Sequence, residues 1–208
     1  MKRIVNVILA LTITTLLSGC GIKFGISNRN ENSNTEYSSS VSEEININEP
    51  MNEISKLDIR IDTSNVKVNY YDGVDINISG RLSKYSKGIK TERKSDVLII
   101  IEEGKKNNIN GDNLSNLEIN IPKSFNGDFD FSFGVGEANI SNLELKEVNI
   151  SSGVGEMNLK DLSFNKLSLE SGVGTTNLIT SKKTGEINIE GGVGETNITL
   201  EDIGGNLT

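Results

Sequence analysis

The 208-residue sequence contains no histidine, no tryptophan, one cysteine and two prolines. Without histidine the chain has no Ser-His or Cys-His nucleophile, no imidazole base and no histidine metal ligand. A single cysteine excludes an intrachain disulfide and a cysteine zinc site. The 29 acidic residues outnumber the 21 basic ones, a poor balance for nucleic acid because phosphate contacts need clustered lysine and arginine. We therefore expect a protein that binds no nucleic acid and needs no cofactor.

The N-terminus has the pattern of an export signal. Two basic residues precede an apolar run over residues 4–17. This run is too short to span a bilayer, where about 20 residues are needed, but it fits the apolar core of a signal peptide. An ordinary signal peptide and an uncleaved anchor helix are the alternatives to the more specific reading that follows.

Residues 17–20 read Leu-Ser-Gly-Cys and resemble a bacterial lipobox, in which the cysteine receives a diacylglyceryl group. We predict that residues 1–19 are a signal peptide cleaved before Cys20, and that acylated Cys20 anchors the chain in the lipid bilayer. Two or more acyl chains hold a protein stably because each buried CH₂ contributes about 0.8 kcal/mol. The expected location is extracytoplasmic, on the outer face of the cell membrane.

Residues 20–52 are rich in asparagine, serine and glutamate, and 27–36 contain no large apolar residue. Such a segment cannot bury enough apolar surface to offset its ordering entropy, which predicts a flexible tether. About 30 residues of random coil reach roughly 30 Å. Ile45 and Ile47 alternate with polar residues, so a first strand can begin before the tether's expected end.

Residues 53–208 show the period-two alternation of β-strands. Apolar residues alternate over 57–61, 66–70, 74–78, 117–121 and 129–133, and 97–101 is a continuous apolar run typical of a strand buried on both faces. β-branched and aromatic residues fill these runs, whereas Gly, Asn, Asp and Ser fill the gaps. No amphipathic helix is evident. The sequence predicts a single all-β domain.

The C-terminal third contains an internal repeat. The motif Gly-Val-Gly occurs four times at spacings of 19, 19 and 20 residues. In every copy two further residues and then Asn-Ile or Asn-Leu follow. Such a period is typical of a solenoid, and we predict a β-solenoid, similar to a parallel β-helix or β-roll, of stacked two-strand coils of about 19–20 residues. Neighbouring strands would lie about 4.8 Å apart. The repeated glycines are Gly134, Gly136, Gly153, Gly155, Gly172, Gly174, Gly192 and Gly194.

The glycine pairs are expected at coil corners, where a positive φ or a close approach of neighbouring coils is needed. Val135 and Ile140 are five residues apart, so a straight strand would place them on opposite faces. We expect the corner to turn both side chains inward.

Two polar rows follow each corner. Asn139, Asn158, Asn177 and Asn197 occupy equivalent positions and predict a ladder of stacked side-chain amides, with a ligand-binding row as the alternative. Glu137, Glu156 and Glu195 stand two residues before these asparagines, and Thr175 replaces the third carboxylate. A solvated acidic edge is the favoured reading, and a Ca²⁺ site is the alternative.

Basic residues concentrate between 81 and 106. An exposed hairpin explains them most simply. The alternative is a patch that meets anionic lipid or wall polymer, where each basic group contributes up to about 1 kcal/mol. The candidate residues are Lys84, Lys87, Lys90, Arg93 and Lys94.

The strand Leu-Glu-Ile-Asn-Ile-Pro-Lys over 117–123, together with the Gly-x-Gly-Glu/Thr coils and their Asn-Ile/Leu steps, resembles the bacterial "putative adhesin" family of β-strand-repeat surface proteins, related to adhesins of the toast-rack type. The resemblance covers 54–208. It implies a β-solenoid or β-roll without a known active site, and some members are linked to envelope-stress signalling.

Three functions are compatible with these features. The first is a non-catalytic binding or adhesion module, with wall polymer or a host surface as partner. The second is an extracytoplasmic partner of a membrane protein in envelope-stress signalling. The third and remote one is a carbohydrate-active enzyme, because Asp128 and Asp130 share one face of a strand and glycosidases use paired carboxylates. The first is favoured, and the chain is expected not to be an enzyme.

Overall fold

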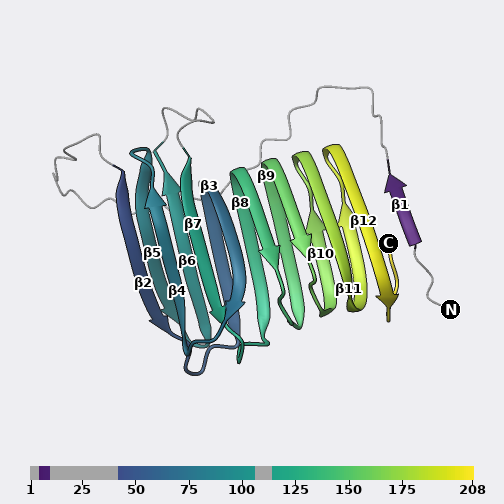
Figure 1. Ribbon diagram of the computed structural model, residues 1–208, viewed down its shortest axis with the longest axis horizontal. Helices are drawn as coiled ribbons and strands as arrows, with labels where there is room; N and C mark the ends of the chain where they lie inside the picture. The colour runs from purple at the N-terminus through teal and green to yellow at the C-terminus, as the bar shows by residue number, and fades with distance from the viewer. Residues whose placement is uncertain (1–4, 10–41, 106–113) are drawn as a thin grey trace.

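The computed structural model describes residues 5–9, 42–105 and 114–208, and every regular element in these ranges is a β-strand. The predicted all-β class is therefore confirmed. The strands join one open mixed sheet in the order β1-β12-β11-β10-β9-β8-β3-β7-β4-β2, and the β5–β6 hairpin joins β3 through β6 (Figure 1). The strands are β1 (Val5–Leu9), β2 (Glu43–Pro50), β3 (Lys56–Tyr71), β4 (Asp75–Leu82), β5 (Ser86–Lys94), β6 (Val97–Gly104), β7 (Ser115–Pro122), β8 (Asp128–Ser141), β9 (Glu147–Lys160), β10 (Phe164–Glu170), β11 (Val173–Glu190) and β12 (Val193–Ile203).

Two short stretches of the described chain lie outside the predicted β-domain. β2 falls within the expected tether and pairs antiparallel with β4, with Ile47 opposite Ile78. The apolar alternation of Ile45 and Ile47, whose side chains pack against the core, is strong enough to start the sheet by Glu43. β1 falls within the expected signal peptide and pairs antiparallel with β12. Cys20 lies outside the described residues, and no helix within them is long and apolar enough to cross a membrane.

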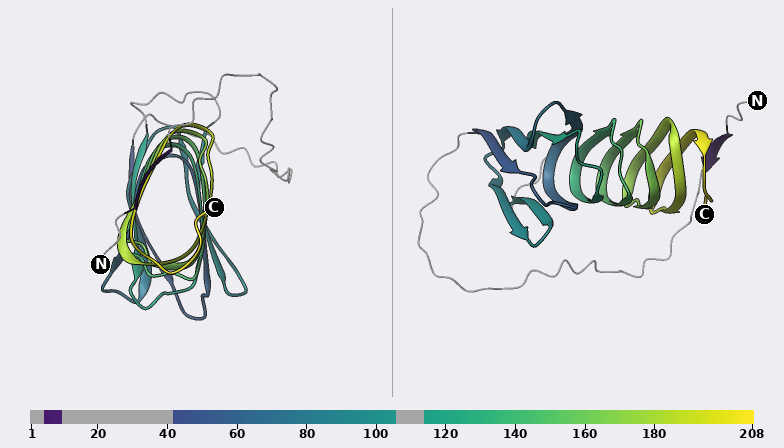
Figure 2. Two further views of the ribbon diagram at one scale, coloured as in Figure 1. Left: turned by 90° about the vertical axis from the view of Figure 1, so that its right-hand side faces the viewer. Right: turned by 90° about the horizontal axis from the view of Figure 1, so that it is seen from below.

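The repeats stack in parallel and in register. We divide them into four repeat units, residues 128–146, 147–165, 166–185 and 186–205, which begin at equivalent positions of neighbouring strands. Val135 pairs with Val154, Val154 with Val173, and Val173 with Val193. Seen end-on, the ribbons of successive units superpose along one oval outline (Figure 2).

β3 forms one more layer against the first unit, although it lacks the glycine motif. Its first half pairs in parallel with the start of β8, Leu57 opposite Phe129, and its second half with the end of β8, Val68 opposite Ile140. On its other side, the first half meets β6 and the second half meets β7. β3 therefore connects the regular units to the less regular N-terminal strands.

The core consists of apolar rows that run across the strands. Ile59, Phe131 and Ile150 occupy successive places in one row, and Val68, Ile140 and Leu159 in another. All six are at most 2% exposed. Each fully buried side chain of this kind contributes about 1.5–3 kcal/mol, so neighbouring units stabilise one another through their inner faces.

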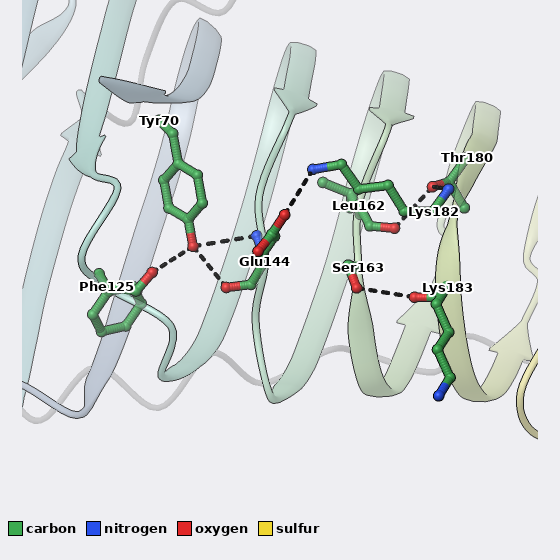
Figure 3. Close-up of polar contacts among 8 residues, drawn as sticks. All are labelled: Tyr70, Phe125, Glu144, Leu162, Ser163, Thr180, Lys182 and Lys183. Atoms are coloured by element: carbon green, nitrogen blue, oxygen red, sulfur yellow. Dashed lines mark hydrogen bonds and ion pairs between the residues drawn. The ribbon is translucent and has the colours of Figure 1, made fainter. Parts of the chain in front are cut away.

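Away from the glycine corners, the second edge of the stack is tied by polar contacts between successive layers (Figure 3). The Tyr70 hydroxyl donates to the carbonyls of Phe125 and, at 2.6 Å, Glu144, and it accepts from the Glu144 N–H at 3.2 Å. Burial raises the pKa of Tyr70, which keeps the phenol protonated as a donor. Lys182 reaches back to the Glu144 carboxylate at 3.5 Å.

Candidate functional site: the Gly-Val-Gly corners and their polar rows

The second glycine of each corner has a backbone conformation that other residues rarely adopt. The φ angles of Gly136, Gly155, Gly174 and Gly194 lie between 138° and 145°. A Cβ on Gly155 would lie 1.9 Å from the carbonyl oxygen of Gly136 in the preceding unit. Glycine is therefore required at this position both by the dihedral angle and by the close approach of neighbouring strands.

The valine between the glycines points outward, so the prediction that Val135 turns inward with Ile140 is wrong. Val154 is 50%, Val173 52% and Val193 71% exposed, and Val135 is partly exposed. Phe133 and Ala138 are both buried although they are five positions apart, so the alternation of inward and outward side chains changes at the corner, before the valine rather than after it. The four valines thus form an outward row, called the valine ridge below.

The four asparagines lie side by side in adjacent strands. The Asn158 amide donates to the Asn139 carbonyl oxygen at 3.2 Å, Asn177 to Asn158 at 2.8 Å, and Asn197 to Asn177 at 3.0 Å. The amides of Asn158, Asn177 and Asn197 thus all donate toward the N-terminal end of the stack. The row links all four units through side chains as well as backbone.

The glutamate row lies between the valine ridge and the asparagines. The Glu137 and Glu156 carboxylates accept from Asn139 at 2.7 Å and from Asn158 at 3.0 Å. Thr175 pairs with Glu156 on one side and Glu195 on the other, so it interrupts the carboxylates. Within the described ranges, no group of three or more acidic or cysteine side chains is placed to hold a metal ion.

The five basic candidates are exposed, but Arg93 lies on the opposite face of β5 from Lys90 and Lys94. On β5, Lys90 lies opposite Ile101 and Lys94 opposite Val97, whereas Arg93 lies opposite Leu98 on the other face of the strand. Arg93 donates to the carbonyls of Pro50 and Asn52.

Three of the other basic side chains have local contacts. Lys87 pairs with Glu103 at 3.0 Å and Lys94 with Glu92 at 3.4 Å. Lys84 lies over the Tyr85 ring, 4.9 Å from its centroid. The two ion pairs partly neutralise Lys87 and Lys94, so the positive potential around residues 84–94 is weaker than the sequence alone suggests.

Asp128 and Asp130 share the outer face of β8, and both are engaged by their neighbours. Asp130 pairs with Lys56 and accepts from the Asn149 amide at 2.9 Å, and the side-chain hydrogen bond with Asp130 raises the pKa of Lys56. Asp128 accepts from the Glu147 N–H at 3.3 Å. These contacts join adjacent layers.

A buried polar group at the β3 bend was not apparent from the sequence. Glu102 is 1% exposed and accepts from the backbone N–H groups of Asp62 and Thr63 at 3.1 and 3.0 Å. Burial raises the pKa of the Glu102 carboxyl, against the opposing effect of the Thr63 N–H. The carboxylate caps N–H groups at the same level as the glycine corners. The only signal for this capping role in the sequence is that Glu102 directly follows the apolar run of β6.

Comparison with solved structures finds bacterial chains that superpose on this one to different extents. A "putative cell adhesion protein" from Clostridium sporogenes ATCC 15579 superposes with a TM-score of 0.55 at 16% identity, covering 80% of this chain and all of that one. A "putative adhesin" from Bacteroides fragilis NCTC 9343 gives a TM-score of 0.35 at 16% identity, covering 79% of this chain and 96% of that one. No protein family matches the sequence, and no curated protein matches it either. The similarity to the Clostridium protein is one of fold.

Proposed function

We propose that this chain is a lipid-anchored surface protein whose β-domain is a non-catalytic binding module of the adhesion type. The observation that carries the proposal is the in-register stack of four units, each presenting the same outward row of side chains. Stacked repeats offer an extended surface on which equivalent groups recur. The fold shared with the Clostridium protein supports the same class of function.

In this proposal the parallel stack is a β-solenoid. Each repeat unit makes two strands separated by a glycine corner, and each buries its inner apolar residues only against the neighbouring layers. The alternation of buried and outward residues along β8 and β9 agrees with two strands per unit.

The anchor is Cys20, acylated after removal of residues 1–19. Residues between Cys20 and β2 at Glu43 would separate the β-domain from the lipid surface. The module would then act outside the cytoplasm, where wall polymer or another cell surface is within reach.

The anchor is tested by membrane fractionation and mass spectrometry of the N-terminal peptide in cells that express the native chain or the Cys20→Ser variant. We expect a diacylated Cys20 peptide and membrane retention for the native chain, and neither for the variant. An intact N-terminus on the native chain would contradict the anchor.

The binding function is tested with the purified protein on wall fragments, on glycan arrays and on matrix proteins, alongside a crosslinking pull-down from intact cells. Saturable binding to one of these surfaces supports the adhesion-type module. Recovery of a membrane sensor alone would replace it with the signalling function.

A further inference from the structure

We propose that the valine ridge is a docking site for an extended polypeptide segment rich in lysine or arginine. This proposal rests on the proposed function of the domain as a binding module and names the class of its partner.

The fold does not require apolar side chains on the ridge. Val154, Val173 and Val193 are at least half exposed and lie outside the buried core. Threonine has the same branched shape and a similar preference for strands. Nevertheless all four units carry valine. An apolar row that the interior does not use is a mark of an interaction surface.

The ridge is straight, narrow and bordered by bare backbone. Its valines lie in adjacent strands about 4.8 Å apart, so the row of four is about 14 Å long. Glycines stand on both sides of every valine, so no neighbouring side chain hides the backbone strip. An extended chain rises about 3.3 Å per residue, and four to five residues would cover the row.

Carboxylates flank the ridge on both sides. On one side, an exposed glutamate lies two residues after the valine in three of the four units. On the other side, an exposed glutamate lies three residues before the valine in the last two units. In the third unit, Thr175 takes the place of the glutamate after the valine, but Glu170 lies before the valine. Segments 127–145, 147–159, 167–181 and 184–208 contain no lysine or arginine. The five carboxylates belong to Glu137, Glu156, Glu195, Glu170 and Glu190.

A basic extended peptide fits this arrangement. Successive side chains of an extended chain point to opposite sides, so a peptide lying along the ridge directs alternate residues to each acidic row. The aliphatic stem of lysine or arginine can cover apolar surface while its charged end stays at the carboxylates. A second copy of the ridge fits poorly, because acidic rows would then face each other and like charges oppose association.

The test is the binding of fluorescein-labelled octalysine to the full-length protein in detergent, followed by fluorescence anisotropy at low ionic strength. We expect saturable binding that weakens with salt. The double variant Val154→Thr/Val173→Thr should weaken binding about four- to fifteenfold, because it removes apolar contact equivalent to one or two methylene groups. Val74→Thr is the matched control: Val74 is 79% exposed at a distant turn, and its replacement should leave binding unchanged.

A second pair of variants distinguishes binding at the valine ridge from non-specific attraction of octalysine to an acidic protein. Glu156→Gln should weaken binding severalfold, because Glu156 belongs to the acidic row beside the ridge. Glu118 is exposed on β7, away from the ridge, so Glu118→Gln should have little effect. Unchanged thermal melting shows that the variants remain folded.

Three results would overturn the proposal. These results are no binding of octalysine, equal weakening of binding by the two glutamine variants, and native binding by the double variant Val154→Thr/Val173→Thr. Valine-dependent binding of a neutral β-glycan, or valine-dependent self-association, without octalysine binding would assign the ridge to another occupant. Because this assay needs neither lipid nor wall material, its outcome is independent of whether Cys20 is acylated or the protein binds walls.

Discussion

Replacing the second corner glycine of a middle unit should be far more damaging than adding a methyl group to a nearby loop glycine. In Gly155→Ala the new Cβ would lie 1.9 Å from the Gly136 carbonyl oxygen, whereas ordinary C···O contacts are about 3.3 Å or more. The residue would also keep a φ of 139°, which costs about 1–3 kcal/mol for a residue other than glycine. Strain and displacement together should destabilise the fold by about 3–5 kcal/mol, a fifth or more of a typical stability of about 5–15 kcal/mol.

The assay is thermal and urea unfolding followed by far-UV circular dichroism. A loss of about 1 kcal/mol lowers the Tm of a domain of this size by about 2–4 °C, so Gly155→Ala should melt roughly 6–20 °C below the native protein. The control is Gly191→Ala, because nothing lies within 4 Å of its added Cβ. That variant should be neutral or stabilised by a few tenths of a kcal/mol through lower entropy of the unfolded chain.

Two further substitutions separate dihedral strain from crowding. Gly153 has no positive φ but its Cβ would lie 2.3 Å from the Gly134 oxygen, so Gly153→Ala tests crowding alone. In Gly194→Ala the new Cβ would lie 1.8 Å from the Gly174 oxygen. Gly194 lies in β12, which has only β1 on its outer side. Because β12 can move away, the loss of stability should be smaller than for Gly155→Ala. The reasoning is refuted if Gly155→Ala melts within 2 °C of Gly191→Ala, since about 1 kcal/mol then bounds the whole effect.

Three other predictions follow from single side chains. Asn177→Ala removes one bond to each neighbouring amide and should cost about twice as much as Asn197→Ala, or about 1–3 kcal/mol in total, in urea unfolding; equal losses would contradict an energetic ladder. Tyr70→Phe removes the contacts of the hydroxyl with two carbonyls and one N–H and should lower the free energy of unfolding by about 1–3 kcal/mol, with no change in the circular dichroism spectrum. Burial raises the pKa of Glu102 from its model-compound value of 4.5, so the folded state binds its proton more tightly than the unfolded state, and this group lowers stability as pH rises from 4.5 through its folded pKa. Glu102→Gln should remove that decline and Glu118→Gln should retain it, as measured by urea unfolding between pH 4 and 8.

The periodic features of the fold could be predicted from the sequence because they depend on local patterning. Alternation identified β3, β4, β7 and β8, and the recurrence of the glycine motif indicated equivalent corners. Pairing partners in the N-terminal part could not be predicted in the same way. β3 meets β6 along one half and β7 along the other, and such long-range pairings are fixed by packing of whole faces, which no local window contains.

The orientation of the valines shows where parity arguments fail. Phe133 and Ala138 are both buried although they are five positions apart, an odd number, so the alternation changes at the corner, and the exposure of the valines places that change before Val135. A sequence shows that a change must occur between two alternating segments but not at which residue. The buried Glu102 was missed for a related reason: its role depends on the unpaired N–H groups of Asp62 and Thr63, which exist only once β3 has bent.

The corner thus contains residues under different kinds of constraint. Gly136 and its equivalents are fixed by the approach of neighbouring strands, and the asparagines are fixed by the amides beside them, so their recurrence follows from stacking. Val154, Val173 and Val193 are at least half exposed and lie outside the buried core, and water around them disfavours their exposure. Stacking therefore explains why these corners align but not why they carry valine, and a partner that covers the ridge supplies the missing cause.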